Sequence, residues 1–189
     1  MKRTQKMSIN DVICDAVKYF MATFAILTIL AAVAPADLIP ADLINELHEG
    51  SNLTHSDLQG VNLSRSHLNR SDLSYSNLQG ANLSLTHLIG ADLSSIIAKD
   101  ADFSRARMNR VRLYGSDLSH ANLCGADLRG ANIMNANLSS ADLSNAILQE
   151  SRMSGANLTG ANLRGVIMNN VNLTDADLTG ADMSRAFLA

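Results

Sequence analysis

The sequence is poor in the residues on which disulfide-rich and aromatic-lined binding proteins depend. Its 189 residues include two cysteines, two prolines, no tryptophan and 4% aromatic residues. Two cysteines, Cys14 and Cys124, exclude a disulfide framework and a cysteine-rich zinc module. The scarcity of aromatic residues leaves few surfaces on which bases or sugars could stack. No proline follows Pro40, as expected for a fold in which nearly every backbone N–H is hydrogen-bonded.

Neither sign of charge dominates the chain. Fifteen Lys and Arg residues against 18 Asp and Glu residues give a formal net charge of −3. This balance excludes a strongly basic nucleic-acid-binding protein and a protein with a long acidic tail. Hydrophobic residues make up 47% of the chain, yet the mean hydropathy is only +0.04. Polar and apolar residues therefore alternate in some regular way.

The regularity is a five-residue repeat that runs from Ser51 to Ala189 without an insertion or deletion. We call the central residue of each repeat i; it occurs at every fifth position from Leu53 to Leu188, which gives 28 repeats. Leucine fills 21 of these positions. Position i−2 is small and is most often alanine, position i−1 is Asp or Asn in 19 repeats, and all 11 glycines lie at i+2.

A period of five matches neither an α-helix nor a β-strand. It requires a backbone that turns through a fixed angle every five residues, with the residues at i and i−2 directed inward. An Asp or Asn beside the central residue can bond to nearby backbone groups at a corner. Glycine at a constant offset suits a corner that has positive φ.

This pattern closely resembles the pentapeptide-repeat family, whose motif is written A(D/N)LXX. Segments 81–85 (ANLSL) and 91–95 (ADLSS) carry the resemblance, which covers about three quarters of the chain. The resemblance implies an all-β solenoid, a right-handed quadrilateral β-helix with four repeats in each coil. Twenty-eight repeats would then form about seven coils, and at the usual strand spacing the rod would be roughly 34 Å long.

Departures from the motif support a coil of four repeats and identify one unusual side. Nine repeats lack Asp or Asn at i−1, and six of the nine are separated by four repeats or by a multiple of four. One further residue, Asp127, completes that series. We call the series the His67 column: His67, His87, Arg107, Asp127, Ile147, Ile167 and Phe187. The column is predicted to lie on one face of the rod and to form an interaction surface.

The residues before the repeats are predicted to form two further segments. The pattern of residues 37–50 predicts a short helix that caps the first coil, with Asp42 near its start and Gly50 at its C-terminal end. The alternative is one more coil, because the five-residue phase continues at Leu38 and Leu43. The β-helix itself is predicted to occupy residues 51–189.

Residues 1–36 combine four basic residues with a continuous apolar run over residues 19–34. The run is shorter than the roughly 20 residues that span a bilayer, and it ends in small residues, as an export signal peptide does. An uncleaved membrane anchor through residues 12–34 is the competing interpretation. Either would place the rod outside the cytosol. The third alternative is a cytoplasmic protein in which the run is an apolar cap.

The sequence predicts no catalytic, cofactor or metal site. Its many Ser and Asp residues are placed by the repeat, and no nucleophile motif surrounds them. His67 and His87 are one coil apart but lack a third ligand, and Arg107 follows them in the column. No enzymatic activity is therefore expected.

Two surface features could bind a partner. The densest charge cluster is a basic patch that could receive an acidic protein or lipid headgroups, although a solvated face is the simpler interpretation. Its members are Arg105, Arg107, Arg110 and Arg112. The second feature is the apolar end of the His67 column, Ile147, Ile167 and Phe187, where polar residues are the rule.

These features predict a non-enzymatic protein, exported or membrane-anchored, that acts as a protein-binding or structural module. Its protein partner is unknown, nucleic acid is not expected to bind, and a homodimer could form through the C-terminal coil. One alternative follows from the resemblance: some pentapeptide-repeat proteins mimic DNA and protect a type II topoisomerase. Residues 51–189 carry 11 basic and 12 acidic residues, which makes a poor polyanion. A secreted effector is the other alternative.

Overall fold

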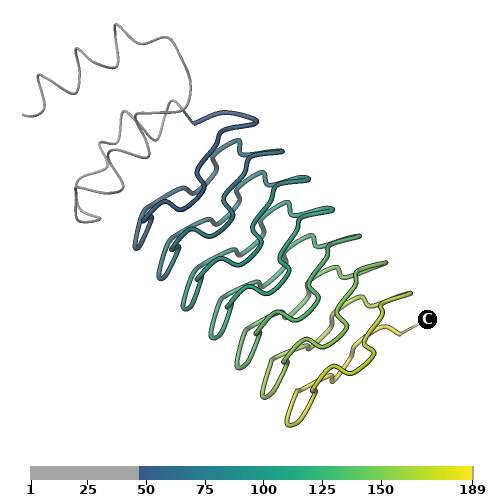
Figure 1. Cartoon of the computed structure of the whole chain (residues 1–189). Coiled ribbons are helices and arrows are strands. Elements are labelled where there is room, and N and C mark those ends of the chain that lie inside the picture. Colours follow the sequence, from purple (N-terminus) through teal and green to yellow (C-terminus); the bar gives the residue numbers. More distant parts are fainter. Residues whose placement is uncertain (1–46, 189) are drawn as a thin grey trace, which may run out of the picture.

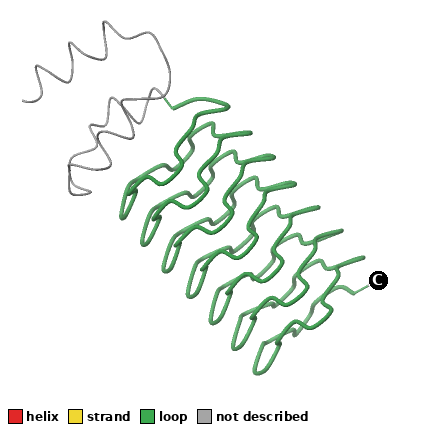
Figure 2. Cartoon of the chain, viewed as in Figure 1, coloured by secondary structure: helices red, strands yellow, loops and turns green. Residues whose placement is uncertain are grey.

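The computed structural model describes residues 47–188, which wind into a stack of similar coils along one axis (Figure 1). Successive coils lie side by side in the order of the sequence, so each coil contacts mainly the coil before it and the coil after it. Within residues 47–188 there is no helix and no strand longer than a single bridge residue (Figure 2). The fold is therefore a solenoid built from turns and isolated bridges.

Parallel bridges join residues that are four repeats apart, as the spacing of the motif departures predicted. They form four ladders, one on each side of the coil, and each ladder consists of the i−1 residues. We name the four faces after the first residue of each ladder, which are Asn52, Asp57, Asn62 and His67. The predicted His67 column is the fourth ladder, from His67↔His87 to Ile167↔Phe187.

Backbone hydrogen bonds connect each coil to the next on every face. The N–H of Leu53 donates to the carbonyl of Asp72 at 2.7 Å, and the N–H of Asp72 donates to the carbonyl of Ser51 at 2.9 Å. A third bond joins the corners, for example from the N–H of Gly60 to the carbonyl of Gln79 at 2.9 Å. Because this set recurs along the rod, most of its backbone polar groups are satisfied.

Every residue at position i+2 from Gly50 to Arg185 has positive φ, and these residues form the corners. Eleven of them are glycine, the residue that adopts this conformation without steric cost. The other 17 include no Val, Ile or Thr, the residue types for which this conformation is most costly. The prediction that glycine at i+2 marks a positive-φ corner is confirmed.

The interior is a continuous column of the residues at i and i−2. Nearly every central residue from Leu53 to Met168 is fully buried. One coil differs from its neighbours on the Asp57 face, because a large Ile96 accompanies a small Ala98 and both are buried. Beyond Met168 the inward residues are only partly buried, and Leu188 is 64% exposed.

A hydrogen bond to the nearby backbone explains the preference for Asp and Asn at position i−1. Each of the 19 such residues accepts a hydrogen bond on Oδ1 from the backbone N–H two residues later, as Asn52 does from Thr54 at 3.0 Å. This Asx turn satisfies a backbone donor that the bonds between coils leave free.

The predicted signal or anchor, residues 1–36, lies outside the described residues, as does most of the predicted cap. The described part of that cap, residues 47–50, is not helical, and Gly50 has the positive φ of a corner. Its N–H donates to the carbonyl of Asn69 at 2.9 Å, as other corner residues do to the next coil. Residues 47–188 contain no helix long and apolar enough to cross a membrane.

The exchange of volume between Ile96 and Ala98 gives a stability prediction. In the coils on either side the same positions hold Ser76 with Leu78 and Ser116 with Leu118. We expect Ile96→Ser to cost about 2–5 kcal/mol of unfolding free energy because it leaves a cavity. Ala98→Leu alone should cost about 1–3 kcal/mol because it overfills the core. The double variant recreates the neighbouring pair and should lie within about 1 kcal/mol of the wild type.

Urea unfolding of the four proteins measures this coupling. If the loss in the double variant equals the sum of the two single losses, the two side chains do not share one volume and the interpretation is wrong.

Candidate functional site

The His67 face is the one side of the rod on which Asx turns are largely missing. On the other three faces 18 of 21 ladder residues are Asp or Asn, but on the His67 face only Asp127 is. The N–H of Ile89 is bonded instead to Oδ1 of Asn69 in the preceding coil, at 3.0 Å. Within residues 47–188, four other backbone N–H groups that follow this ladder at i+1 have no acceptor: those of Asn69, Asn109, Gln149 and Asn169.

The other faces have fewer free donors of this kind. Within residues 47–188, the i+1 N–H groups without an acceptor are that of Lys99 on the Asp57 face and those of Tyr114 and Ser154 on the Asn52 face. Each follows one of the three remaining departures from Asp or Asn. The departures from the motif mark these positions in the sequence. Only the geometry of the Asx turn shows that a departure can leave a backbone N–H without its usual acceptor.

Charge is also distributed unevenly around the rod. We call the His67 face, its i+1 residues and its two flanking corner columns the His67 side; the corner columns begin at Arg65 and at Gly50. This side holds seven of the 11 Lys and Arg residues in 47–188 but only three of the 13 Asp and Glu residues, so its formal charge is +4. The remainder holds four basic and ten acidic residues, a formal charge of −6. The small net charge of the chain therefore conceals a basic side. Its charged residues are Arg65, Arg70, Arg105, Arg107, Arg110, Arg129, Arg185, Glu49, Asp127 and Glu150.

Several arginines on this side have no ion-pair partner among the described residues. Arg70 pairs with Glu49 at 3.1 Å, and Arg129 pairs with Asp127. The hydrogen bond from Arg129 holds the pKa of Asp127 below its ordinary value, against the opposing effect of partial burial. No carboxylate of residues 47–188 pairs with the four arginines that remain in the coils preceding Asp127, and all four are exposed: Arg65, Arg105, Arg107 and Arg110.

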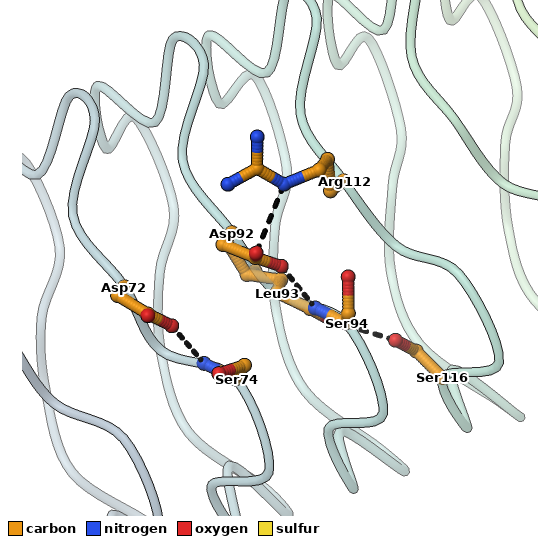
Figure 3. Close-up of polar contacts among 7 residues, drawn as sticks. All are labelled: Asp72, Ser74, Asp92, Leu93, Ser94, Arg112 and Ser116. Atoms are coloured by element: carbon orange, nitrogen blue, oxygen red, sulfur yellow. Dashed lines mark hydrogen bonds and ion pairs between the residues drawn. The ribbon is translucent and has the colours of Figure 1, made fainter.

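The structure divides the predicted basic patch between two faces. Arg105, Arg107 and Arg110 lie on the His67 side, at one corner, on the ladder and at the next corner. Arg112 lies on the adjacent Asn52 face, where its Nε donates to Oδ2 of Asp92 at 2.9 Å (Figure 3). Arg112 is therefore neutralised locally, and within residues 47–188 most of the unpaired basic residues lie on the His67 side.

Figure 3 also shows how the neighbouring Asn52 face is organised. Asp92 accepts a hydrogen bond from the N–H of Ser94 at 3.0 Å, and Ser116 Oγ donates to the carbonyl of Leu93 at 2.6 Å. Partial burial tends to raise the pKa of Asp92, but the bonds from Ser94 and Arg112 outweigh it and hold that pKa below its ordinary value. The departure from the motif at Arg112 is thus partly offset by an ion pair.

The two histidines of the column contact each other. The rings of His67 and His87 are 4.5 Å apart between centroids and meet edge to face at 77°. Partial burial and the nearby charges of His67 and Arg107 hold the pKa of His87 below its ordinary value of 6.5. In the described part of the chain no group of three or more His, Cys, Asp or Glu residues could hold a metal ion.

The other end of the His67 face is apolar. Ile147, Ile167 and Phe187 follow one another in the ladder; the two isoleucines are partly buried and Phe187 is 63% exposed. The face therefore changes from basic to apolar along the rod axis. Cys124 is a partly buried free thiol that lies outside this ladder.

Comparison with known proteins identifies a family that has this architecture. The family profile described as pentapeptide repeats matches eight copies, at residues 49–84, 86–123, 112–150 and 147–188. The chain belongs to the pentapeptide-repeat family. Proteins of this family form right-handed quadrilateral β-helices, in agreement with the four ladders of parallel bridges.

Solved structures of other proteins are similar to the chain to different degrees. A trypsin-treated form of QnrB1, described as a plasmid-mediated fluoroquinolone resistance protein, is 21% identical and shares the fold, with a TM-score of 0.52 over 75% of this chain and 78% of that one. HetL, a pentapeptide-repeat protein from the cyanobacterium Nostoc that is described as involved in heterocyst differentiation regulation, is 24% identical. The match covers 73% of this chain and 89% of HetL, with a TM-score of 0.26.

A pentapeptide-repeat protein from the cyanobacterium Cyanothece 51142 is 31% identical and covers 75% of this chain and 90% of its own, with a TM-score of 0.26. None of the curated proteins with which the chain was compared matches it significantly. The comparisons therefore establish the family and the fold, and the surface of this chain has to be interpreted from its own residues.

The histidine pair gives a pH prediction. Because folding disfavours protonated His87, stability should fall as the pH drops below about 6.5, when the imidazole becomes charged more readily in the unfolded chain. Arg107→Asn removes a neighbouring positive charge, so it should raise the pKa of His87 toward 6.5, as measured by NMR titration of the imidazole.

Arg112→Asn on the Asn52 face is the control, because Arg112 is not among the charges that lower this pKa. An equal change in both variants, or no change in either, would show that Arg107 does not act directly on His87.

Proposed function

We propose that this protein is a non-enzymatic binding module that contacts a protein partner through the His67 side. The rod of about seven coils acts as a rigid support that displays this side along its length. The observation that carries the proposal is that, within residues 47–188, arginines without an ion-pair partner, N–H groups without a protein acceptor and apolar ladder residues are concentrated on one side. A merely solvated surface gives no reason for all three to occur together.

The proposed location follows from the sequence of residues 1–36. A basic start followed by the apolar run over residues 19–34 supports export or membrane anchoring, so the rod would act outside the cytosol. Intact mass and N-terminal analysis of the native protein from separated cell fractions tests this. An intact start in the cytosolic fraction would contradict both export and anchoring.

Protection of a type II topoisomerase is the second candidate function. The fold resemblance to QnrB1 and the acidic charge of the other three faces favour it. The magnitude of the charge argues against it. A duplex as long as a rod of roughly 34 Å carries about 20 phosphate charges, at one per 1.7 Å. The acidic faces of this protein carry a formal charge of only −6.

A supercoiling assay with gyrase and a fluoroquinolone separates the two functions. We expect addition of the purified protein to leave the inhibition of gyrase by the drug unchanged. Restored supercoiling would favour topoisomerase protection instead.

Photo-crosslinking tests the His67 side directly. A photoreactive amino acid replaces Ile89 on the His67 side or Ile97 on the Asp57 face, which are 40% and 51% exposed. We expect a partner adduct in intact cells from position 89 and none from position 97. Adducts of equal yield, or an adduct from position 97 alone, would contradict the proposal.

A further inference from the structure

We propose that the partner is an acidic, extended segment of another protein that lies along the rod axis over the His67 side. Its acidic part would face the unpaired arginines, and its apolar part would cover Ile147, Ile167 and Phe187. This inference rests on the proposed function, because it identifies the kind of partner that the same side would bind.

Charge complementarity supports an acidic segment. Arg65, Arg105, Arg107 and Arg110 are exposed and have no ion-pair partner within residues 47–188. Guanidinium groups bind carboxylates through paired hydrogen bonds, which are stronger than those between neutral groups. The acidic remainder of the rod repels an acidic segment, so the charge distribution also selects the side on which the segment binds.

The backbone of this side adds hydrogen-bond donors. The N–H groups of Asn69, Asn109, Gln149 and Asn169 have no acceptor within the described part of the chain. They occupy the same position in different coils, so they form a row parallel to the rod axis. A polypeptide brings carbonyl and carboxylate oxygens at close spacing, whereas an apolar surface alone would leave these donors unsatisfied.

The length of the side sets a minimum length for the segment. Six bridges connect His67 to Phe187 through successive coils. At a strand spacing of about 4.8 Å they span about 29 Å, which an extended chain covers with about nine residues. The segment would have its acidic residues near one end and its apolar residues near the other, since the face changes character along the axis.

Charge reversal of arginines on the His67 side tests the proposed contact with the acidic half of the segment. The probe is a labelled synthetic peptide with a glutamate-rich half and an apolar half containing leucine and phenylalanine, titrated by fluorescence anisotropy. Arg107→Glu with Arg110→Glu should weaken binding at least about tenfold and reduce its dependence on salt. Lys99→Glu with Arg152→Glu is the matched control, because these two residues are also exposed and unpaired but lie off the His67 side.

Substitution of ladder residues by the asparagine of the repeat motif tests the proposed contact with the apolar half of the segment. Ile147→Asn with Ile167→Asn restores the Asx acceptor for the N–H groups of Gln149 and Asn169 and removes apolar surface. We expect a higher melting temperature together with weaker binding of the peptide. A role confined to stability would predict no loss of binding, so this pair of measurements distinguishes a binding surface from a merely structural one.

The outcomes separate this inference from the proposed function. Binding by the wild type that both His67-side variants weaken supports the acidic segment. Binding to vesicles containing phosphatidylglycerol, but not to the peptide, overturns it in favour of an anionic membrane. Crosslinks at position 89 without any binding of the peptide overturn the partner class and leave the proposed function intact. Equal weakening by the control variant would overturn the inference by showing that only the overall charge matters.

Discussion

The whole structure depends on closure of each coil after four repeats, so that one residue on each side pairs with its counterpart in the next coil. The corner makes this closure possible, because a residue with positive φ at every fifth position turns the chain by the same amount each time. An insertion would displace all later residues from their ladders. The uninterrupted five-residue phase of residues 51–189 reflects this constraint in the sequence.

The same closure determines which side chains are free to vary. Residues at i and i−2 fill a narrow interior, so their combined volume is limited, and Ile96 with Ala98 preserves it by exchange. The corners from Gly50 to Arg185 contain no β-branched residue but accept arginine, tyrosine and leucine. Variation in chemistry therefore accumulates at i−1, at i+1 and at the corners, where most residues are at least partly exposed, and the rod can carry a binding surface without altering its core.

Much of this architecture could be predicted from the sequence because repetition makes the pattern easy to recognise. The coil of four repeats followed from the spacing of His67, His87 and Arg107, and the positive-φ corner from the position of the glycines. The sequence predicted only that Asp or Asn would bond to nearby backbone groups, not which N–H would be bonded. It therefore could not predict that the N–H of Asn109 lacks an acceptor within residues 47–188. The pairing of Arg112 with Asp92 depends on two side chains in successive coils, and it changed the membership of the basic patch. In residues 1–46 the five-residue phase continues only at Leu38 and Leu43, so the repeat gives little basis for predicting the structure of this segment.

The distribution of the lost Asx turns argues for a role of the His67 side. A lost turn forgoes a hydrogen bond, which contributes about 0.5–1.5 kcal/mol. On the Asn52 face, Arg112 gains an ion pair to Asp92 that offsets part of this loss. On the His67 face, Arg107, Ile147 and Ile167 gain no such bond, and the N–H groups that follow them at i+1 have no acceptor within residues 47–188. Random drift would distribute the lost turns evenly over the four faces. Their concentration on the face at the centre of the His67 side, which holds seven of the 11 Lys and Arg residues in 47–188, is the pattern expected if a partner completes these hydrogen bonds, as proposed.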